Sequence, residues 1–393
     1  MHRLPCFVFV VSLSLTLCLG TFTSGSILNL GPEELVQANG MPIQVPGYSV
    51  PSFVDWDNDG INDLVIGEGG GGSIGKVRIY TNIGTDSNPQ FQTYYYAQAG
   101  GGDLTCTPEG CLGCFPRVVY WDDNNEKDLL VGLGDGTVKI YLNIGTEQSP
   151  VFDAGTKIRV GLPDWEGDLD VGTRATPTFI DWNNNSLTDV VVGAYDGKIR
   201  VYNNCGCGGP IPPHFYFTSS DGEPAMTADG ALTVPSGRSS PVIMDLDGDG
   251  KKDILTGNTN GQLLFYKNTW TDESPEFTNY ELVESNGVPI KLGGPAGTPR
   301  SRPSVCYWNG KHDGYSDVLI GAGDGQVHLY RGKPMVGDLN GDGDIDFNDF
   351  AYLAHCWFAA GTGDCIVADF NKDGQVDWLD LQAFADAWLM GVQ

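Results

Sequence analysis

Residues 51–67, PSFVDWDNDGINDLVIG, decide the fold of this chain. Two short apolar runs stand at the ends of the segment, and a polar turn joins them. The turn carries four aspartates: Asp55, Asp57, Asp59 and Asp63. Carboxylates spaced in this way on a tight turn converge on one point, which is the arrangement that Ca²⁺ prefers. The segment therefore predicts two β-strands joined by a cation-binding loop.

The same segment recurs four more times along the chain. The later copies are PRVVYWDDNNEKDLLVG, PTFIDWNNNSLTDVVVG, PVIMDLDGDGKKDILTG and PSVCYWNGKHDGYSDVLIG, from Pro116, Pro177, Pro241 and Pro303. The aspartates that close the five copies are spaced by 61 to 65 residues. Each copy is followed by a Gly-containing turn and an alternating strand that ends in Tyr. Four short strands in each of five units predict a mainly β fold, a five-bladed β-propeller.

The two ends of the repeat array complement each other. The fifth copy stops at Arg331, before an outer strand, whereas residues 34–45 (ELVQANGMPIQV) nearly repeat residues 281–292 (ELVESNGVPIKL) of the fourth copy. We therefore expect the N-terminal segment to supply the missing outer strand, which closes the ring and removes two exposed strand edges. The alternative is an incomplete sixth repeat in an open array.

The D-x-D-x-D-G-x-x-D-L loop, the Gly-rich turn and the V-x-I-Y strand together resemble FG-GAP/VCBS repeats. Members of that family form β-propellers with Ca²⁺ in the loop. The resemblance implies a calcium-binding propeller over residues 26–333, but it implies neither a ligand nor a reaction.

The blade loops differ in how many oxygen ligands they offer. The first copy offers Asp55, Asp57, Asp59, the backbone carbonyl of Ile61 and Asp63, and the fourth offers Asp245, Asp247, Asp249, the carbonyl of Lys251 and Asp253. The third offers Asp181, Asn183, Asn185 and Asp189. Without a cation, each pair of like charges ~4 Å apart costs about 4 kcal/mol at an effective dielectric constant of ~20. We expect Ca²⁺ in the first and fourth loops and weaker binding in the third.

The second and fifth copies begin with Tyr120 and Tyr307 in place of the first aspartate. Their side chains can hold the turns by hydrogen bonds alone, so we expect these two loops to need no metal. The same Asx-turn structure, without a metal, is the alternative for the other copies.

Two further aspartate-rich loops of twelve residues lie near the C-terminus. They match the EF-hand ligand positions 1, 3, 5, 7, 9 and 12 with Asp338, Asn340, Asp342, Asp344, Asp346 and Asp349, and with Asp369, Asn371, Asp373, Gln375, Asp377 and Asp380. Gly343 and Gly374 stand at position 6, where the loop turns sharply. Each loop leads into a segment with apolar residues at helical spacing, which predicts an amphipathic helix.

This duplicated loop-and-helix unit resembles a type I dockerin, a module that docks exported bacterial proteins onto cohesin-bearing scaffolds. The resemblance covers residues 336–390 and implies a dockerin-like domain at residues 334–393, two Ca²⁺ ions and a cohesin-like scaffold partner. Loop positions 10 and 11, where cellulosomal dockerins often carry Ser or Thr, hold Phe347 and Asn348, and Trp378 and Leu379. This departure argues against a standard cellulosomal partner.

Charge and the N-terminal segment indicate the compartment and exclude two classes of partner. The formal net charge of −28 repels nucleic-acid phosphates and anionic lipids. Residues 1–25 combine His2 and Arg3, an apolar run too short to span a bilayer, and small residues near Ser24 and Gly25. They predict a signal peptide, without membrane insertion, on a secreted or cell-surface bacterial protein.

The eight cysteines beyond the signal peptide favour disulfides, as expected for an exported protein. Cys106, Cys111 and Cys114 could instead be three thiolate ligands of Zn²⁺, although no fourth ligand is evident. Cys356 and Cys365 lie between the C-terminal loops and could link them.

Two other sets of residues have both a functional and a structural interpretation. A Trp follows the first loop position in four copies, at Trp56, Trp121, Trp182 and Trp308, and we favour packing between blades over sugar stacking. Candidate acids of a funnel-like active site lie at or near the Gly-rich turns: Glu68, Asp135, Asp196 and Asp324. We favour turn formation for these four as well.

Three functions remain open at this point. The first is a non-catalytic propeller that binds a glycan or a protein and is attached to a polysaccharide-degrading assembly. The second is a polysaccharide hydrolase or lyase with its site in the propeller funnel, and the third is a structural adhesion protein. The sequence shows no H-E-x-x-H motif.

Overall fold

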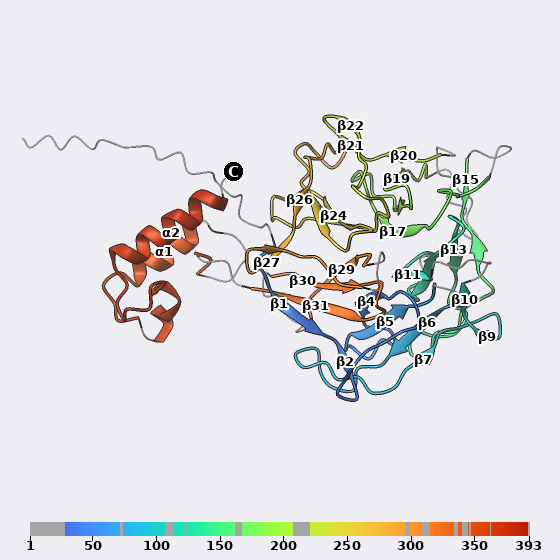
Figure 1. The fold of residues 1–393 in the computed structure, drawn as a ribbon, viewed down its shortest axis with the longest axis horizontal. Coiled ribbons are helices and arrows are strands. Elements are labelled where there is room, and N and C mark those ends of the chain that lie inside the picture. The colour runs from blue at the N-terminus through green and yellow to red at the C-terminus, as the bar shows by residue number, and fades with distance from the viewer. Residues whose placement is uncertain are drawn as a thin grey trace, which may run out of the picture.

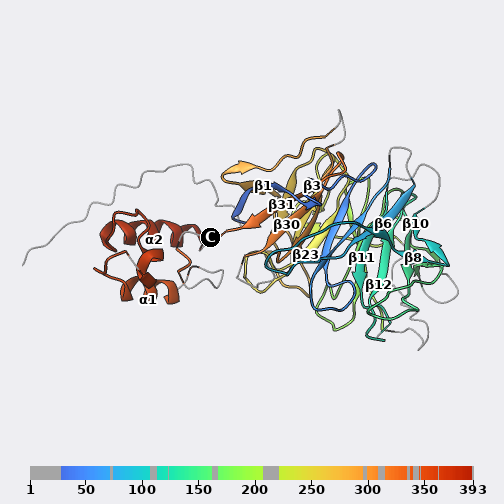
Figure 2. The ribbon, with the colours of Figure 1, turned by 90° about the horizontal axis from the view of Figure 1, so that it is seen from below.

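The computed structural model describes residues 28–391 except for 71–73, 107–112, 123, 162–166, 207–220, 295–298, 309–314, 334–336, 340–344, 346 and 362. The signal peptide expected at residues 1–25 lies outside the described residues. The described chain forms a ring of β-sheets and, to one side of it, a small unit with two helices (Figures 1 and 2).

The ring is a five-bladed β-propeller, as the repeat predicts. Blade 1 contains β4 (Val50–Val54), β5 (Asp63–Gly67), β6 (Gly75–Tyr80), β7 (Tyr95–Tyr96) and β10 (Thr105–Cys106). Blade 2 contains β11 (Phe115–Val119), β12 (Asp128–Gly132), β13 (Val138–Tyr141) and β14 (Thr156–Lys157). Blade 3 contains β17 (Thr176–Ile180), β18 (Asp189–Gly193), β19 (Ile199–Tyr202) and β20 (Glu223–Pro224). Blade 4 contains β23 (Pro241–Met244), β24 (Asp253–Gly257), β25 (Leu263–Tyr266) and β26 (Glu281–Leu282).

Blade 5 is completed by the N-terminal strand. It contains β29 (Arg302–Cys306), β30 (Asp317–Gly321), β31 (Val327–Gly332) and β1 (Leu30–Leu35). Strand β1 pairs antiparallel with β31, with Glu34 opposite Leu329 and Leu35 opposite His328. The prediction of a ring closed by the N-terminal segment is confirmed, and the closing strand begins a few residues earlier than the sequence match indicated.

A short β-hairpin follows the outer strand of every blade. The five hairpins are β2 (Gln37–Ala38) with β3 (Met41–Pro42), β8 (Gln98–Ala99) with β9 (Gly102–Asp103), β15 (Arg159–Val160) with β16 (Gly167–Asp168), β21 (Met226–Thr227) with β22 (Gly230–Ala231), and β27 (Glu284–Ser285) with β28 (Val288–Pro289). The residues 281–292 and 34–45 that match in sequence thus both run from an outer strand into a hairpin.

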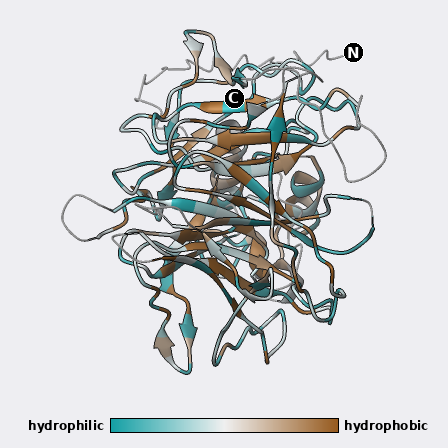
Figure 3. Cartoon of the chain, turned by 90° about the vertical axis from the view of Figure 1, so that its right-hand side faces the viewer, coloured by the Kyte–Doolittle hydropathy of each residue, from teal (hydrophilic) through white to brown (hydrophobic). Residues whose placement is uncertain are grey.

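Five apolar cores lie between neighbouring blades, and the second strand of each blade is buried along its whole length. The strands of the ring are accordingly more apolar than its loops (Figure 3). All four repeated tryptophans are buried in these cores, each within 4.6 to 5.8 Å of a Phe ring. Trp56, for example, packs on Phe152 of the next blade. Packing between blades is therefore confirmed for this position.

Two disulfides join described cysteines, Cys106 with Cys114 and Cys356 with Cys365. Cys205 is also disulfide-bonded, and Cys306 is a buried free thiol. Because Cys106 and Cys114 are bonded to each other, they cannot act as thiolate ligands of Zn²⁺; Cys111 lies outside the described residues.

The C-terminal unit consists of α1 (Phe347–His355), the 3₁₀ helix η1 (Gly363–Ala368) and α2 (Trp378–Gly391). Its own small core contains Leu353, Val376 and Phe384. In the part of the chain that the structure describes, neither helix has the length and apolar character needed to cross a membrane.

Candidate metal centres and the propeller axis

The first-blade loop, residues 55–63, directs several carboxylate oxygens at one point. The backbone N–H of Gly60 donates to Asp55 Oδ2 (3.0 Å). The other oxygen, Asp55 Oδ1, and Asp57 Oδ1 are buried and have no hydrogen-bond partner. Ligand atoms of Asp55, Asp57 and Asp63 lie within 4.8 Å of one another. Orphaned buried acceptors in such a cluster fit a hard divalent cation.

Asp59 serves the turn itself rather than this cluster. Its Oδ1 accepts the backbone N–H of Ile61 (2.8 Å) and its side chain is exposed. Asp59 still acts on the site. The pKa of Asp57 is raised first by the burial of Asp57 and then by the negative charge of Asp59. The structure thus brings together three of the four aspartates that the sequence singled out.

The closing aspartate links two backbone segments by hydrogen bonds in every blade. In blade 1, Asp63 accepts the backbone N–H groups of Trp56 (3.1 Å) and Asn82 (2.7 Å), which tie the start of the loop to the turn after β6. The other four make the same pair of bonds: Asp128, Asp189, Asp253 and Asp317. Burial raises the pKa of Asp63 to about 7, although both N–H groups act to lower it. This role explains why the closing aspartate is present even where Tyr120 and Tyr307 replace the first aspartate of the loop.

The fourth-blade loop, residues 245–253, has the same geometry but a different charge balance. Ligand atoms of Asp245, Asp247 and Asp253 again lie within 4.8 Å of one another. Here Lys267 Nζ lies 2.5 Å from Asp247 Oδ2, and Lys251 Nζ lies 2.9 Å from Asp249 Oδ2. Position 267 is equivalent to Thr81 of blade 1, the residue after the Tyr that ends the third strand. An ammonium group therefore competes with a metal at this loop.

The third-blade loop is held mainly by its own turn. Asp181 accepts the backbone N–H groups of Asn185 (3.1 Å) and Ser186 (2.8 Å), and Asn183 Oδ1 is buried without a hydrogen-bond partner. Asp189 is buried. In the fifth copy, residues 309–314 lie outside the described residues.

Only part of the first C-terminal loop is described. Asp338 and Asp349 are buried, and Asp349 accepts the backbone N–H of Leu339 (2.7 Å). Four of its proposed ligands lie outside the described residues: Asn340, Asp342, Asp344 and Asp346.

The second C-terminal loop is described throughout. Asp369 Oδ2 accepts the N–H of Gly374 (3.0 Å), the same bond that Asp55 makes in the first blade. Asp373 Oδ1 accepts the N–H of Gln375 (3.0 Å), and Asn371 Nδ2 donates to Asp373 (2.9 Å). Asp377 caps α2 by accepting the N–H of Leu379, and the buried Asp380 accepts the N–H of Phe370. The bonding within this loop therefore follows that of the blade loops.

The four candidate acids of the funnel are all engaged in local bonds. Glu68 pairs with Arg78, Asp135 accepts the N–H of Thr137 (3.0 Å), and Asp196 pairs with Arg200 (2.7 Å). Asp324 lies 3.3 Å from His328 Nε2. Burial acts to raise the pKa of Asp196 and Asp324, but their partners hold both pKa values below the ordinary value. These bonds favour the structural interpretation.

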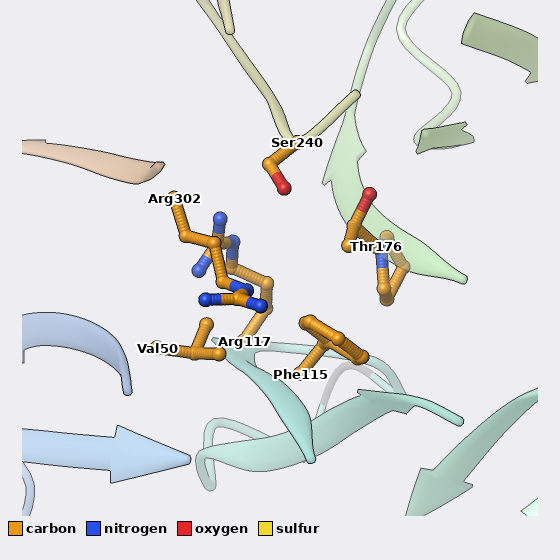
Figure 4. A pocket seen from close by; sticks show the side chains of 7 residues that line it. Val50, Phe115, Arg117, Thr176, Ser240 and Arg302 are labelled. Carbon is orange, nitrogen blue, oxygen red and sulfur yellow. The ribbon is translucent and has the colours of Figure 1, made fainter. Parts of the chain in front are cut away.

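The axis of the ring is lined by one equivalent residue from each blade, the residue before the repeated Pro. These five residues are Val50, Phe115, Thr176, Ser240 and Arg302. With Arg117 and Pro177 they enclose a cavity of about 10 Å³, near the minimum volume that holds one water (Figure 4). Burial lowers the pKa of Arg117 to about 10.

Sequence reasoning missed the arginines around this axis. Arg174, Arg238 and Arg300 each stand three residues before the repeated Pro, in GTRATP, SGRSSP and TPRSRP. Together with Arg302 they are buried, and we call these four residues the axial arginine cluster. The recurrence of Arg at one position in three of five copies was the available signal.

Comparison with known proteins places both parts of the chain. Residues 181–256 match the family model of the FG-GAP-like repeat, and residues 336–386 match that of the Dockerin type I domain. No curated protein matches the chain.

Two solved structures illustrate how far the likeness extends. The complex of BBS1N with ARL6DN, soaked with mercury, is 12% identical, covers 78% of this chain and 97% of its own, and has a TM-score of 0.35. The GH43_1 enzyme from Xanthomonas citri complexed with xylotriose is 11% identical and has a TM-score of 0.43. The match covers 75% of this chain and 89% of the enzyme chain. Likeness at this level transfers no activity. The chain is therefore a five-bladed β-propeller that contains a match to the FG-GAP-like repeat, followed by a C-terminal match to the type I dockerin domain.

Proposed function

We propose that this is a secreted calcium-binding protein whose propeller binds a glycan or a protein without catalysis. Its dockerin attaches it to an extracellular polysaccharide-degrading assembly through a cohesin-like scaffold. In this proposal residues 1–25 are removed on export, residues 26–333 form the propeller and residues 334–393 form the dockerin.

Calcium is the metal that the loops suit best. In the first-blade loop, Asp55, Asp57 and Asp63 would hold it, with the carbonyl of Ile61 as a further oxygen ligand. The fourth-blade loop offers an equivalent set in Asp245, Asp247 and Asp253, and in the second dockerin loop the residues at the EF-hand positions would be the ligands. The bound ion would neutralise clustered carboxylates and fix the loops; we propose no chemical step for it.

The engagement of the four funnel acids is the observation that carries the non-catalytic proposal. Glycoside hydrolysis uses two carboxyl groups that face the scissile bond from either side. Glu68, Asp196 and Asp324 are instead paired with Arg78, Arg200 and His328, and the axis itself carries arginines. Such a lining suits recognition better than proton transfer.

A glycan array in Ca²⁺, combined with assays for new reducing ends and for unsaturated products on pectins, hemicelluloses and algal polysaccharides, tests this proposal. Calcium-dependent retention without product formation is the expected result. Product formation would instead establish the hydrolase or lyase alternative, and the failure of every glycan to bind would favour structural adhesion.

The dockerin offers an apolar docking surface at the two equivalent loop positions. Phe347 and Trp378 are 76% and 69% exposed, and the neighbouring Leu379 is 54% exposed. Phe347 also packs edge-on against Trp388 of α2 (4.9 Å), so the surface rests on the helix. We propose a cohesin-like partner with an apolar complement at these positions.

A pull-down of cohesin-like domains with and without EDTA tests this part. Capture should require Ca²⁺ and should weaken in Trp378→Ser, because a large apolar contact is lost. Phe358→Ser is the matched control, since Phe358 is equally exposed but lies outside positions 10 and 11. Capture that survives chelation would contradict the calcium-dependent dockerin.

A further inference from the structure

The loops that carry three of the axial arginines share an unusual backbone conformation. Arg174, Arg238 and Arg300 have φ angles of 61°, 63° and 47°, in the left-handed region that residues with side chains rarely adopt. The backbone N–H of each donates to the Gly-rich turn beside it: Arg174 to Gly134 O, Arg238 to Tyr195 O and Arg300 to Thr259 O (3.0 to 3.1 Å). Three blades thus use the same strained turn to place an arginine.

Arg174 and Arg300 meet Arg302 through two shared aromatic rings. Arg300 and Arg302 both lie over the Tyr48 ring, at 4.2 and 4.9 Å, and Arg174 and Arg302 both lie over the Phe115 ring, at 4.9 and 5.6 Å. Arg302 therefore belongs to both stacks, and the guanidinium groups gather near the axis.

The cluster presents hydrogen-bond donors that no protein group accepts. Arg174 donates to Ser239 O (3.1 Å) and Ser240 Oγ (2.9 Å), and Arg302 donates to Ser49 O (3.5 Å). Six other buried nitrogens have no partner: Arg174 Nε, Arg238 Nη1, Arg300 Nε and Nη1, and Arg302 Nε and Nη2. Buried donors without an acceptor are rare in native proteins because each loses its bonds to water.

The cluster also lacks a counter-charge. Among the described residues, no ion pair joins any of these four arginines to a carboxylate, although the net charge of the chain is −28. Burial, followed by repulsion from the other arginines, lowers the pKa of Arg174 and lowers that of Arg302 to about 9. Four buried, mutually repelling cations with free donors call for an anion.

We propose that the axial arginine cluster is a binding site for an oxyanion, a carboxylate or sulfate group. The guanidinium fork matches the paired oxygens of both groups, and planar rings already fix its orientation. The axial cavity described above has room for about one water and is too small for the oxyanion. The oxyanion therefore lies outside this cavity, nearer to Arg238 and Arg300, the most exposed of the four arginines.

The oxyanion has two chemical sources. One is a free inorganic ion that neutralises the centre of the ring. The other is the acidic group of a sugar, whose ring would rest at the rim, where Tyr195 is 51% exposed and stacks on Arg238 (4.5 Å). A free ion would occupy the site whether or not the propeller binds a glycan, so this inference does not depend on the proposed function.

Titration calorimetry of the calcium-loaded chain tests the site, with sodium sulfate, trigalacturonate and neutral galactotriose as probes at fixed ionic strength. The double variant Arg238→Gln/Arg300→Gln should weaken anion binding at least about tenfold, because charge-assisted hydrogen bonds are lost. Arg331→Gln is the matched control, since Arg331 is an exposed arginine paired with Glu34, and it should bind as the wild type does.

Saturable binding of sulfate alone identifies a free ion as the source, and binding of trigalacturonate identifies a sugar-borne group; loss of either in the double variant supports the site. Binding of neither anion, or equal binding by wild type and double variant, overturns it. Should the variant fail to fold, crystals of the wild type soaked in selenate decide. An anomalous peak within hydrogen-bond distance of the axial arginines is expected, and its absence, together with the absence of trigalacturonate there in a second soak, rejects the site.

Discussion

The innermost strands of blades 3 and 4 run between an arginine and an aspartate: Arg174 and Asp181 in blade 3, and Arg238 and Asp245 in blade 4. Strand β17, which is five residues or about 16 Å long, runs between Arg174, two residues before its start, and Asp181, directly after its end. The carboxylate end draws every ligand of one site from a single loop. The arginine end draws one site from several blades. A repeat can thus make separate sites at one face of a ring and a single shared site at the other.

The largest expected effect is the loss of stability when metal is removed from the carboxylate end. Removing Ca²⁺ should destabilise the propeller, because each saturated site adds about 2.7 kcal/mol at a hundredfold excess of ion over Kd. The double variant Asp57→Asn/Asp247→Asn should lose most of this gain in denaturant unfolding with Ca²⁺ against EDTA. Asp229→Asn, an exposed aspartate of the β21–β22 hairpin, is the control. Identical stability of the wild type with and without Ca²⁺ would refute metal binding by the blades.

The second effect concerns pH, which should act on the carboxylate end alone. In the metal-free protein Asp63 and Asp253 have pKa values of about 7, above the ordinary value, chiefly because they are buried. The folded state then binds more protons than the unfolded state, so stability falls as pH rises from 4 through 7. We expect a gain on the order of 1–2 kcal/mol per carboxyl from pH 7.5 to 5.5.

Calcium should reverse this pH dependence, since it binds only the ionised carboxylates. Its apparent affinity should therefore fall as pH drops below 7. Denaturant unfolding at several pH values, with EDTA and with Ca²⁺, measures both trends. A metal-free protein whose stability rises with pH over this window would show that the two carboxyls are ionised in the folded state.

A smaller effect distinguishes the two complete blade loops. Lys267→Thr should raise the calcium affinity of the fourth-blade loop, because the ammonium group that competes for Asp247 is removed. The reciprocal change Thr81→Lys should weaken the first-blade loop by a similar factor, about fivefold for ~1 kcal/mol of repulsion. Calcium titrations of the two variants, each with the other loop disabled, compare the sites. A change of calcium affinity in the same direction in both variants would contradict this explanation.

The smallest effect is expected at the arginine end. Without an anion, Arg302→Met removes a cation stacked on two rings but also relieves repulsion, so stability should change by less than ~1 kcal/mol. Chemical denaturation in buffer that lacks oxyanions measures this. A loss of several kcal/mol would mean that the arginine mainly supports packing.

The contrast also explains what could be predicted from the sequence. The number of blades, the closing strand and the positions of the cation loops follow from motifs whose residues lie close together in the chain. Lys267 reaches the fourth-blade loop from beyond the next two strands, so the loop motif alone does not reveal it. Arg174 and Arg302 meet only after blades far apart in sequence close into a ring, and no local spacing encodes that contact.

Closure by the N-terminal strand has a mechanical consequence. The dockerin match follows β31, so a pull through a partner bound to the dockerin would enter the ring through that strand. Strand β31 is not at an edge: it pairs with β30 on one side and with β1 on the other. Extracting it requires both ladders to shear together, whereas an edge strand can be peeled away one bond at a time. The arrangement therefore lets the propeller bear load through its tether without opening.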